Sequence, residues 1–366
     1  MTVPDILARP GHAIAEDVNS GRLSARLVAE AALAAIAAGN GRLGAFTDIT
    51  AERALAEASR VDARIAAGET LPLAGVPYSV KNLFDVEGIT TRAGSKINRD
   101  RPPAARDATL IERMGAAGAV LVGAVNMGEY AYDFTGENAH DGASLNPHDP
   151  SRMSGGSSGG SGTSVAAGMA ALSLGSDTNG SIRVPASFCG LYGLKPTFGR
   201  LSRARTFPFV HSLDHLGTLA RSPRDLALVL DALQGPDADD PALIGRPAVA
   251  AVADLRRGGG DLRIAVAGGY FRNGAGPEAL AAVAHVAGAL GAAREVEIPI
   301  AAAARAAASR RTTSESSALH LDRLRSRAGD FDPDTRDRFL SGAMVPDAWY
   351  LSGQRLRAAA KAAFAS

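Results

Sequence analysis

The chain contains 366 residues, of which 46% are hydrophobic and 21% are charged, so its length allows one large domain or two modest ones. A formal net charge of +1 gives no electrostatic case for binding nucleic acid or an anionic membrane. The single cysteine cannot form an internal disulfide, and neither a secretory signal nor a bilayer-spanning apolar run is found, so we expect a cytoplasmic protein.

Apolar residues recur with helical spacing in four stretches and form short runs in four others. The helical patterns cover residues 13–38, 51–67, 107–117 and 223–233. The short apolar runs, expected as strands, cover residues 76–80, 120–125, 170–174 and 263–267. This alternation predicts an α/β fold in which helices flank both faces of one mixed central sheet.

Residues 154–185 are the most informative segment, because glycine and serine cluster there at two places. Ser157 and Ser158 are flanked by glycines on both sides, and Ser181 follows Gly180. Glycine lets the backbone approach other groups closely, so such turns can present a serine hydroxyl beside converging main-chain N–H groups. A nucleophile with an oxyanion hole needs that arrangement.

Glycine- and serine-rich segments also occur in several other kinds of structure. A flexible linker is disfavoured, because the segment continues into an apolar helical stretch and carries Asp177 and Arg183. A P-loop is excluded because no lysine ends the glycine run, and a dinucleotide fingerprint lacks the strand that should precede it at residues 146–152. The hydrolase pattern G-x-S-x-G is matched, so Asp214 and His215 leave a Ser-His-Asp site open as an alternative.

Lysine is rare in this chain, since only four of the 39 basic residues are lysines. One of them, Lys81, ends the apolar run expected as a strand at residues 76–80. Arginine keeps its proton in proteins, whereas a buried lysine can lose it and act as a base. A lysine at this position, followed in the chain by serine-rich turns, therefore indicates a neutral catalytic base.

Several separate motifs resemble those of the amidase signature family. They are the G-G-S-S-G-G run at residues 155–160, the D-T-x-G-S-I-R-x-P block at residues 177–185, and the strand end formed by Val80 and Lys81. Further matches extend over residues 23–233. The resemblance implies the α/β amidase signature fold and catalysis without a cofactor or a metal ion.

The resemblance also assigns roles to individual residues. Ser181 would attack the amide carbonyl, and Ser157, which follows a cis peptide bond in the family, would relay the proton to neutral Lys81. Backbone N–H groups of the turn that carries the nucleophile would bind the oxyanion, namely those of Thr178, Asn179, Gly180 and Ser181. Three further residues would support the site: Ser158, Asp177 and Arg183.

Details within these motifs resemble the branch of the family that acts on 1-carboxybiuret in s-triazine breakdown. They are Asn82, Asn179 and residues 134–140, whereas Asp141 departs from the aromatic residue often found there. We therefore expect an amidohydrolase that releases ammonia from a small carboxylated or urea-like amide. The alternatives are a glutamine-hydrolysing amidotransferase subunit for misacylated tRNA and a scaffold subunit without turnover.

The sequence is expected to form a single domain over residues 1–366. Within it, N-terminal helices would occupy residues 1–70, the catalytic core residues 71–235, and a variable substrate-side region residues 236–366. The arginine-rich stretch at residues 305–338 would form solvated helices that cap the site.

The helical pattern at residues 351–366 ends without a glycine cap or a proline stop. We therefore expect the C-terminal part of the family domain to be missing and the central sheet to lack its last strand. Besides a small amide substrate, the expected partners are a second copy of the chain and a small helical subunit, with no membrane and no direct nucleic acid contact.

Overall fold

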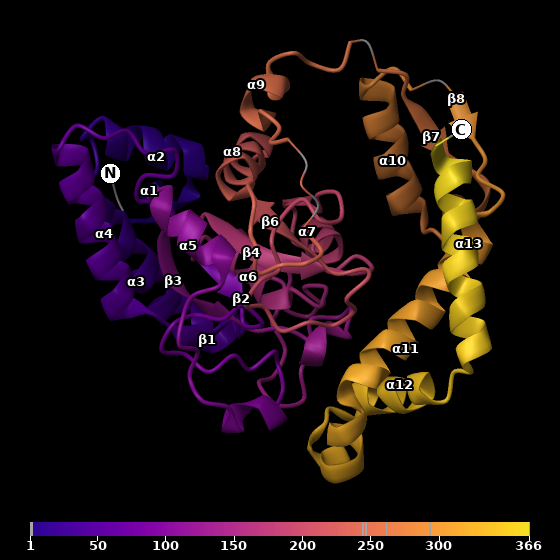
Figure 1. Cartoon of the computed structure of the whole chain (residues 1–366). Coiled ribbons are helices and arrows are strands. Elements are labelled where there is room, and N and C mark those ends of the chain that lie inside the picture. Colours follow the sequence, from indigo (N-terminus) through magenta and orange to yellow (C-terminus); the bar gives the residue numbers. More distant parts are fainter. Residues whose placement is uncertain (1–2, 244, 246, 261, 293, 366) are drawn as a thin grey trace. The chain divides into compact units, whose positions relative to one another are not determined.

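The computed structural model describes residues 3–243, 245, 247–260, 262–292 and 294–365. The chain separates into two compact units, whose elements are labelled in Figure 1. Unit 1 consists of Met1–Arg256 and Asp322–Asp337, and unit 2 consists of Arg257–Leu321 and Arg338–Ser366. The single domain expected over residues 1–366 stays a prediction.

Unit 1 is built around a six-stranded sheet with the strand order β1-β3-β2-β4-β6-β5. β2 is parallel to β3 and β4, whereas β1 is antiparallel to β3, and β6 is antiparallel to both β4 and β5. The sheet is therefore mixed, as predicted. Its strands are β1 (Phe46–Ile49), β2 (Pro77–Lys81), β3 (Val120–Val125), β4 (Leu172–Asp177), β5 (Tyr192–Leu194) and β6 (His215–Ala220).

The central strands β2, β3 and β4 are buried at every position. Strands covered on both faces are rich in apolar residues, which explains the apolar runs in the sequence. Lys81 ends β2 and Asp177 ends β4, and these two strands pair in parallel. The polar residues at both strand ends are therefore brought to the same edge of the sheet.

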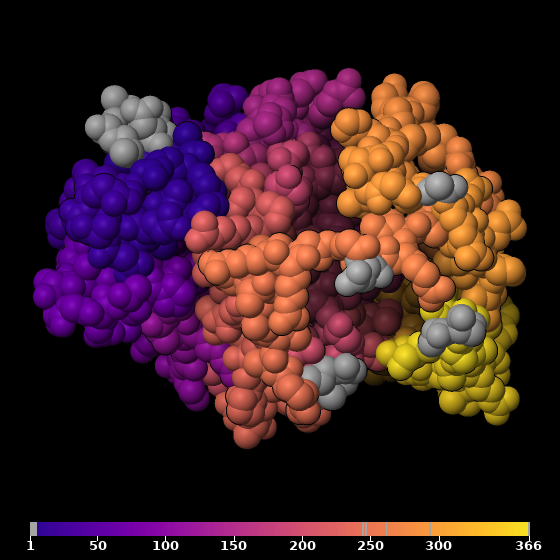
Figure 2. All heavy atoms as spheres, turned by 90° about the horizontal axis from the view of Figure 1, so that it is seen from above, coloured from indigo at the N-terminus to yellow at the C-terminus, as the bar shows by residue number. Residues whose placement is uncertain are grey.

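Helices flank this sheet. α3 and α4 pack with β3, and α6 packs with β2 and β4. α2 contacts α8, so that the N-terminal segment, indigo in Figure 2, lies against the salmon-coloured segment around α8. The helices of unit 1 are α1 (Val3–Ala8), α2 (Gly11–Asn19), α3 (Ala25–Leu43), α4 (Ala51–Ala66), α5 (Thr109–Ala116), α6 (Gly159–Ala166), α7 (Arg183–Phe188), α8 (Pro223–Leu233), α9 (Ala251–Leu255), and the 3-10 turns η1 (Ile97–Asp100), η2 (Glu129–Ala131) and η4 (Ala328–Asp330).

The helical pattern at residues 13–38 is confirmed, and two helices, α2 and α3, occupy this region. The chain turns between them through Gly21, which has a φ of +72°. Ser24 then caps α3 by accepting a hydrogen bond from the N–H of Leu27 at 3.1 Å, a role for which serine is well suited. The apolar spacing continues across the turn, so the pattern alone does not reveal the break.

Unit 2 contains its own two-stranded parallel sheet, formed by β7 (Ala265–Ala267) and β8 (Arg294–Val296). The strand predicted at residues 263–267 is therefore formed as β7 and pairs with β8, while the mixed central sheet expected from the sequence is confirmed. A short apolar run predicts a strand without specifying its partner. The remaining elements of unit 2 are the 3-10 turn η3 (Gly269–Arg272), α10 (Pro277–Ala289) and α13 (Asp347–Ala365).

Two helices, α11 (Ala301–Arg327) and α12 (Pro333–Ala343), belong partly to each unit. They confirm helical structure in the arginine-rich stretch, although it is not solvated throughout, since Arg311 in unit 2 is only 1% exposed. Across the described part of the chain, none of the helices combines the length and the apolar character needed to cross a membrane.

Candidate active site

Lys81, the last residue of β2, lies next to two serine hydroxyls. Its Nζ donates hydrogen bonds to Ser157 Oγ at 2.7 Å and to Ser176 Oγ at 2.9 Å. Lys81 and Ser157 have no exposed surface. Two residues singled out in the sequence, 76 positions apart, are therefore in direct contact inside unit 1.

Burial lowers the pKa of Lys81 from its ordinary 10.5 to about 7, because an ammonium group is poorly stabilised away from water. The carboxylates of Asp133, Asp214 and Asp177 act in the opposite direction and raise this pKa. The balance leaves a large fraction of Lys81 neutral near pH 7. A neutral amine 2.7 Å from a hydroxyl can accept its proton.

Ser157 belongs to a backbone segment that other parts of unit 1 hold in place. The peptide bond between Gly156 and Ser157 is cis. The N–H of Gly128 donates to Ser157 O at 3.2 Å, and the hydroxyl of Ser158 donates to Ser176 O at 3.3 Å. Ser158 thus contacts the backbone of β4 at Ser176, the residue whose hydroxyl contacts Lys81.

Ser181 lies on the turn that joins β4 to α7 and is 3% exposed. Within the described residues its hydroxyl makes no hydrogen bond, so the oxygen is not held by a neighbouring group. Ser181 is therefore placed at the same edge of the sheet as Lys81, directly after the strand that pairs with β2.

Asp177 holds this turn together. Its carboxylate accepts hydrogen bonds from the N–H of Gly180 at 2.8 Å and from Nε and Nη2 of Arg183, both at 2.9 Å. Burial alone would raise the pKa of Asp177, but its hydrogen bond and ion pair with Arg183 lower it. The expectation that Gly180 donates to an oxyanion needs correction, because its N–H is directed at Asp177 in this structure.

The alternative Ser-His-Asp arrangement is not present. Nδ1 of His215 lies 2.5 Å from Leu213 O and 3.2 Å from Asp177 O, so the ring is directed at backbone carbonyls. Asp214 instead accepts hydrogen bonds from Thr178 Oγ1 at 2.6 Å and from backbone N–H groups. His215 and Asp214 therefore do not form the pair that this mechanism requires.

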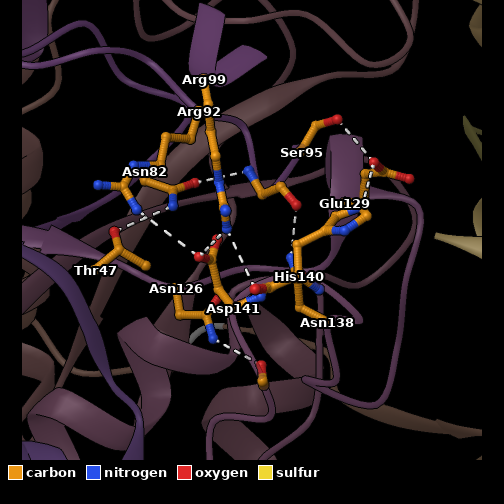
Figure 3. Close-up of polar contacts among 12 residues, drawn as sticks. Thr47, Asn82, Arg92, Ser95, Arg99, Asn126, Glu129, Asn138, His140 and Asp141 are labelled. Carbon is orange, nitrogen blue, oxygen red and sulfur yellow. Dashed lines mark hydrogen bonds and ion pairs between the residues drawn. The ribbon is translucent and has the colours of Figure 1, made fainter. Parts of the chain in front are cut away.

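Asn82, which follows Lys81, anchors the end of β2 in a polar network (Figure 3). Its Nδ2 donates to Thr47 Oγ1 at 3.2 Å, and its Oδ1 accepts from the N–H of Gly94 at 3.0 Å. Asp141, in the same network, accepts a hydrogen bond from Arg99 at 2.7 Å. The network has a structural role, because it fixes the backbone that carries the lysine.

Figure 3 also shows His140, whose Nε2 lies 3.0 Å from Glu129 Oε1. Glu129 accepts further hydrogen bonds from Ser95 Oγ at 2.7 Å and from the N–H of Asp332 at 2.9 Å. Burial raises the pKa of Glu129, while its hydrogen bonds oppose this. Glu129 therefore ties the segment at Asp332 to the core of unit 1.

A cavity of about 220 Å³ adjoins the site in unit 1, and Ser176, Phe207 and Asp214 are among its lining residues. A larger hollow of about 910 Å³ lies in unit 2, lined mainly by apolar residues of β7 and α10. Neither hollow is lined by Lys81, Ser157 or Ser181, but the smaller one is lined by Ser176, which contacts Lys81. Within the described ranges, no group of three or more His, Cys, Asp or Glu side chains is arranged so that it could hold a metal ion.

Sequence reasoning missed Ser176 and Asp133. Ser176 could have been found from strand pairing, because Val80 is opposite Leu174 and the residues that follow both are neighbours. No pattern in the sequence marks Asp133, which follows η2 and influences Lys81 only through the fold.

Residues 27–343 match the family described as Amidase, so the chain belongs to the amidase family and is a hydrolase that acts on amides. AtzE, the 1-carboxybiuret hydrolase subunit of Pseudomonas sp. (strain ADP), is 59% identical over 94% of this chain and 76% of its own length. A solved structure described as a vestigial protein complex that reveals the evolutionary origins of an s-triazine catabolic enzyme is 58% identical, with a TM-score of 0.95, over 96% of this chain and 77% of that chain.

One subunit of the glutamyl-tRNA(Gln) amidotransferase of Anaeromyxobacter sp. (strain K) is 47% identical over 70% of this chain. This chain spans 53% of the length of that amidotransferase protein. The family expected from the sequence is confirmed, and the hydrolase relative is more similar than the amidotransferase relative.

Proposed function

We propose that this chain hydrolyses a C–N bond of a small carboxylated or urea-like amide with release of ammonia, and that 1-carboxybiuret is the best candidate substrate. The observation that carries the proposal is the 2.7 Å contact between buried Lys81 and Ser157 at the strand end beside the Ser181 turn. The choice of substrate is supported by the 59% identity to a 1-carboxybiuret hydrolase subunit.

In the proposed acylation step, Ser181 Oγ attacks the amide carbonyl and gives its proton to Ser157. Ser157 passes its own proton to neutral Lys81, whose Nζ is within hydrogen-bond distance. Backbone N–H groups of the Ser181 turn, those of Thr178, Asn179 and Ser181, stabilise the negative charge on the carbonyl oxygen. The relay then returns a proton to the leaving nitrogen, so that ammonia departs and an acyl group remains on Ser181.

Deacylation uses the same groups in the same order. Water attacks the acyl carbonyl and gives a proton through Ser157 to Lys81, and the proton returns to Ser181 as the product leaves. Ser158, Asp177 and Arg183 do not exchange protons in this scheme. They hold the backbone of the two serine segments in place through the contacts described above.

The proposed role of Lys81 predicts a rate that falls as the pH decreases below about 7. The pKa of Lys81 is lowered to about 7, so the neutral form that accepts a proton predominates above this pH and is lost below it. The logarithm of kcat/KM is expected to fall by about one unit per pH unit on the acid side. A profile from pH 5 to 9, recorded where the fold is intact, checks this. A flat profile with chemistry rate-limiting would count against a neutral lysine.

The amidotransferase alternative is supported by the 47% identity over 260 residues. Ammonia release from 1-carboxybiuret, biuret, malonamate, indoleacetamide and glutamine, each without ATP, separates the two functions. We expect the largest kcat/KM with 1-carboxybiuret and little activity with glutamine. Preference for glutamine would favour the amidotransferase. No turnover of any of the five would contradict the proposed activity and favour a scaffold subunit.

We also propose that the chain binds a partner subunit. A similar solved structure is described as a protein complex, which supports a partner subunit for this chain, and we expect that subunit to be small and helical. A homodimer is the alternative. The mass of the purified protein in solution, alone and after co-expression with neighbouring small reading frames, distinguishes a monomer, a homodimer and a complex with a second subunit.

A further inference from the structure

Asp133, in the loop that follows η2, carries a carboxylate fixed entirely by neutral donors. Its Oδ1 accepts hydrogen bonds from the N–H and the hydroxyl of Thr135, both at 2.7 Å, and its Oδ2 accepts one from the N–H of Gly136 at 2.8 Å. Among the described residues, no basic side chain forms an ion pair with it. The position of this charge is therefore fixed, while no cation neutralises it.

The turn that Asp133 caps is paired with the backbone that precedes Ser157. The N–H of Gly155 donates to Thr135 O at 3.0 Å, and the N–H of Gly156 donates to Phe134 O at 2.9 Å. These two bonds fix the segment whose next residue is Ser157. Any shift of the capped turn would therefore move the serine that contacts Lys81.

Asp133 also packs against two glycines, Gly128 and Gly156, and fills the space that a side chain at either position would need. A Cβ added at Gly156 would overlap Asp133 Oδ2, and one added at Gly128 would overlap Asp133 Cβ. Gly128 in turn donates its N–H to Ser157 O at 3.2 Å. Asp133 is thus wedged between the two backbone stretches that hold Ser157.

Three carboxylates act on Lys81 from three different elements. Asp177, at the end of β4, is paired with Arg183, and Asp214, before β6, is hydrogen-bonded to Thr178. Asp133 has the largest favourable effect of the three on protonated Lys81. Asp133 also packs directly against Gly156, the residue that precedes Ser157.

We propose that Asp133 is a positioning residue for the proton relay, which orients Ser157 and stabilises Lys81 in the protonated form that arises when Ser181 attacks. The inference rests on the proposed mechanism and adds a group that neither the motifs nor the sequence pattern assigns. Asp133 touches neither the substrate nor the reacting atoms, and its effect passes through Ser157 and Lys81.

Asp133→Asn removes the charge but keeps the size of the side chain and an oxygen that can accept from Thr135. We call the fall of kcat/KM on the acid side of its pH profile the acid limb. In the variant we expect the acid limb to move to lower pH by about half a unit or more, because protonated Lys81 loses a negative charge that stabilises it. We also expect kcat to fall by about tenfold with KM changed by less than about twofold. The profiles are measured on the best substrate of the panel above, with thermal unfolding as a check of the fold.

Two variants separate the charge of Asp133 from its part in the turn. Asp149→Asn is the matched control, because Asp149 Oδ1 accepts from the N–H and the hydroxyl of Ser151, at 3.0 and 2.6 Å, but Asp149 does not act on Lys81. Thr135→Val removes one hydrogen bond to Asp133 and leaves its charge. Both should keep the acid limb of the wild-type protein.

The pH profiles of these variants decide whether Asp133 has the proposed role. An unmoved acid limb in a folded Asp133→Asn protein, with an active wild-type enzyme, overturns the role of Asp133 but leaves the proposed function standing. The same shift in Thr135→Val as in Asp133→Asn overturns it too, because turn geometry rather than charge would then be responsible. If Asp133→Asn does not fold, Asp133→Ser, which removes the charge and keeps a hydroxyl for the turn, is measured in its place with the same expected shift and the same contradicting result. A wild-type chain without amide turnover overturns both proposals.

Discussion

Replacement of Ser181 by alanine is expected to lower amide hydrolysis by about a thousandfold or more while leaving the fold unchanged. The substitution removes one oxygen that makes no hydrogen bond within the described residues, from a side chain that is 3% exposed. Packing is therefore preserved, whereas the atom that attacks the carbonyl is lost. Ammonia release and thermal unfolding of the purified variant check the two halves of this expectation.

His215→Ala is the control for this experiment. Its ring contacts backbone carbonyls of Leu213 and Asp177, so its loss should affect local packing and leave most of the turnover. A Ser181→Ala protein that keeps more than a few per cent of its activity would transfer the nucleophile to Ser157. Loss of activity in a well-folded His215→Ala protein would revive the Ser-His-Asp mechanism.

Lys81→Arg is expected to be nearly as damaging as Lys81→Ala, with turnover lowered by about a thousandfold in both. Arginine keeps its proton at any pH a protein survives, so it cannot accept one from Ser157. The larger guanidinium would also have to fit where Lys81 has no exposed surface. Steady-state kinetics of both variants, beside their unfolding temperatures, provide the measurement.

Lys96→Arg is the matched control for this substitution. Lys96 is half exposed and forms an ion pair with Asp330 at 2.8 Å, which an arginine can replace. Its activity should equal that of the unaltered protein. If Lys81→Arg also kept most of its activity, Lys81 would act only as a positive charge, and the proton relay would be wrong.

The contact between Lys81 and Ser157 illustrates what the sequence can predict. Each residue stands out by itself, Lys81 as a rare lysine at the end of an apolar run and Ser157 within a glycine-rich turn. Their proximity then follows from parallel pairing of β2 with β4, because equivalent ends of parallel strands meet at one edge of a sheet. The residue types and the strand pairing therefore both predict a site at this edge of the sheet.

Ser176, Asp133 and the N–H of Gly180 illustrate what the sequence does not reveal. Ser176 is one serine among many in residues 154–185, and only strand pairing places it 2.9 Å from Lys81. Asp133 acts through loop packing, which no spacing rule describes. The N–H of Gly180 is occupied because Asp177 folds back onto its own turn, a detail set by side-chain geometry.

Two details of the fold are likewise not specified by the sequence. Apolar periodicity at residues 13–38 continues through the turn at Gly21, so the pattern does not show that two helices form there. The run at residues 263–267 has strand composition, yet its hydrogen-bond partner is β8. In both cases the local pattern allows more than one structure, and tertiary contacts determine which one forms.

Covalent labelling of the nucleophile tests the central claim most directly. The protein is incubated with an alkyl fluorophosphonate, which phosphonylates activated serine hydroxyls, and the modified residue is located by peptide mapping. The proposed mechanism predicts a single label on Ser181, lost in Ser181→Ala and strongly slowed in Lys81→Arg. A label on Ser157, or labelling of Ser181 that is unaffected by Lys81→Arg, would contradict it.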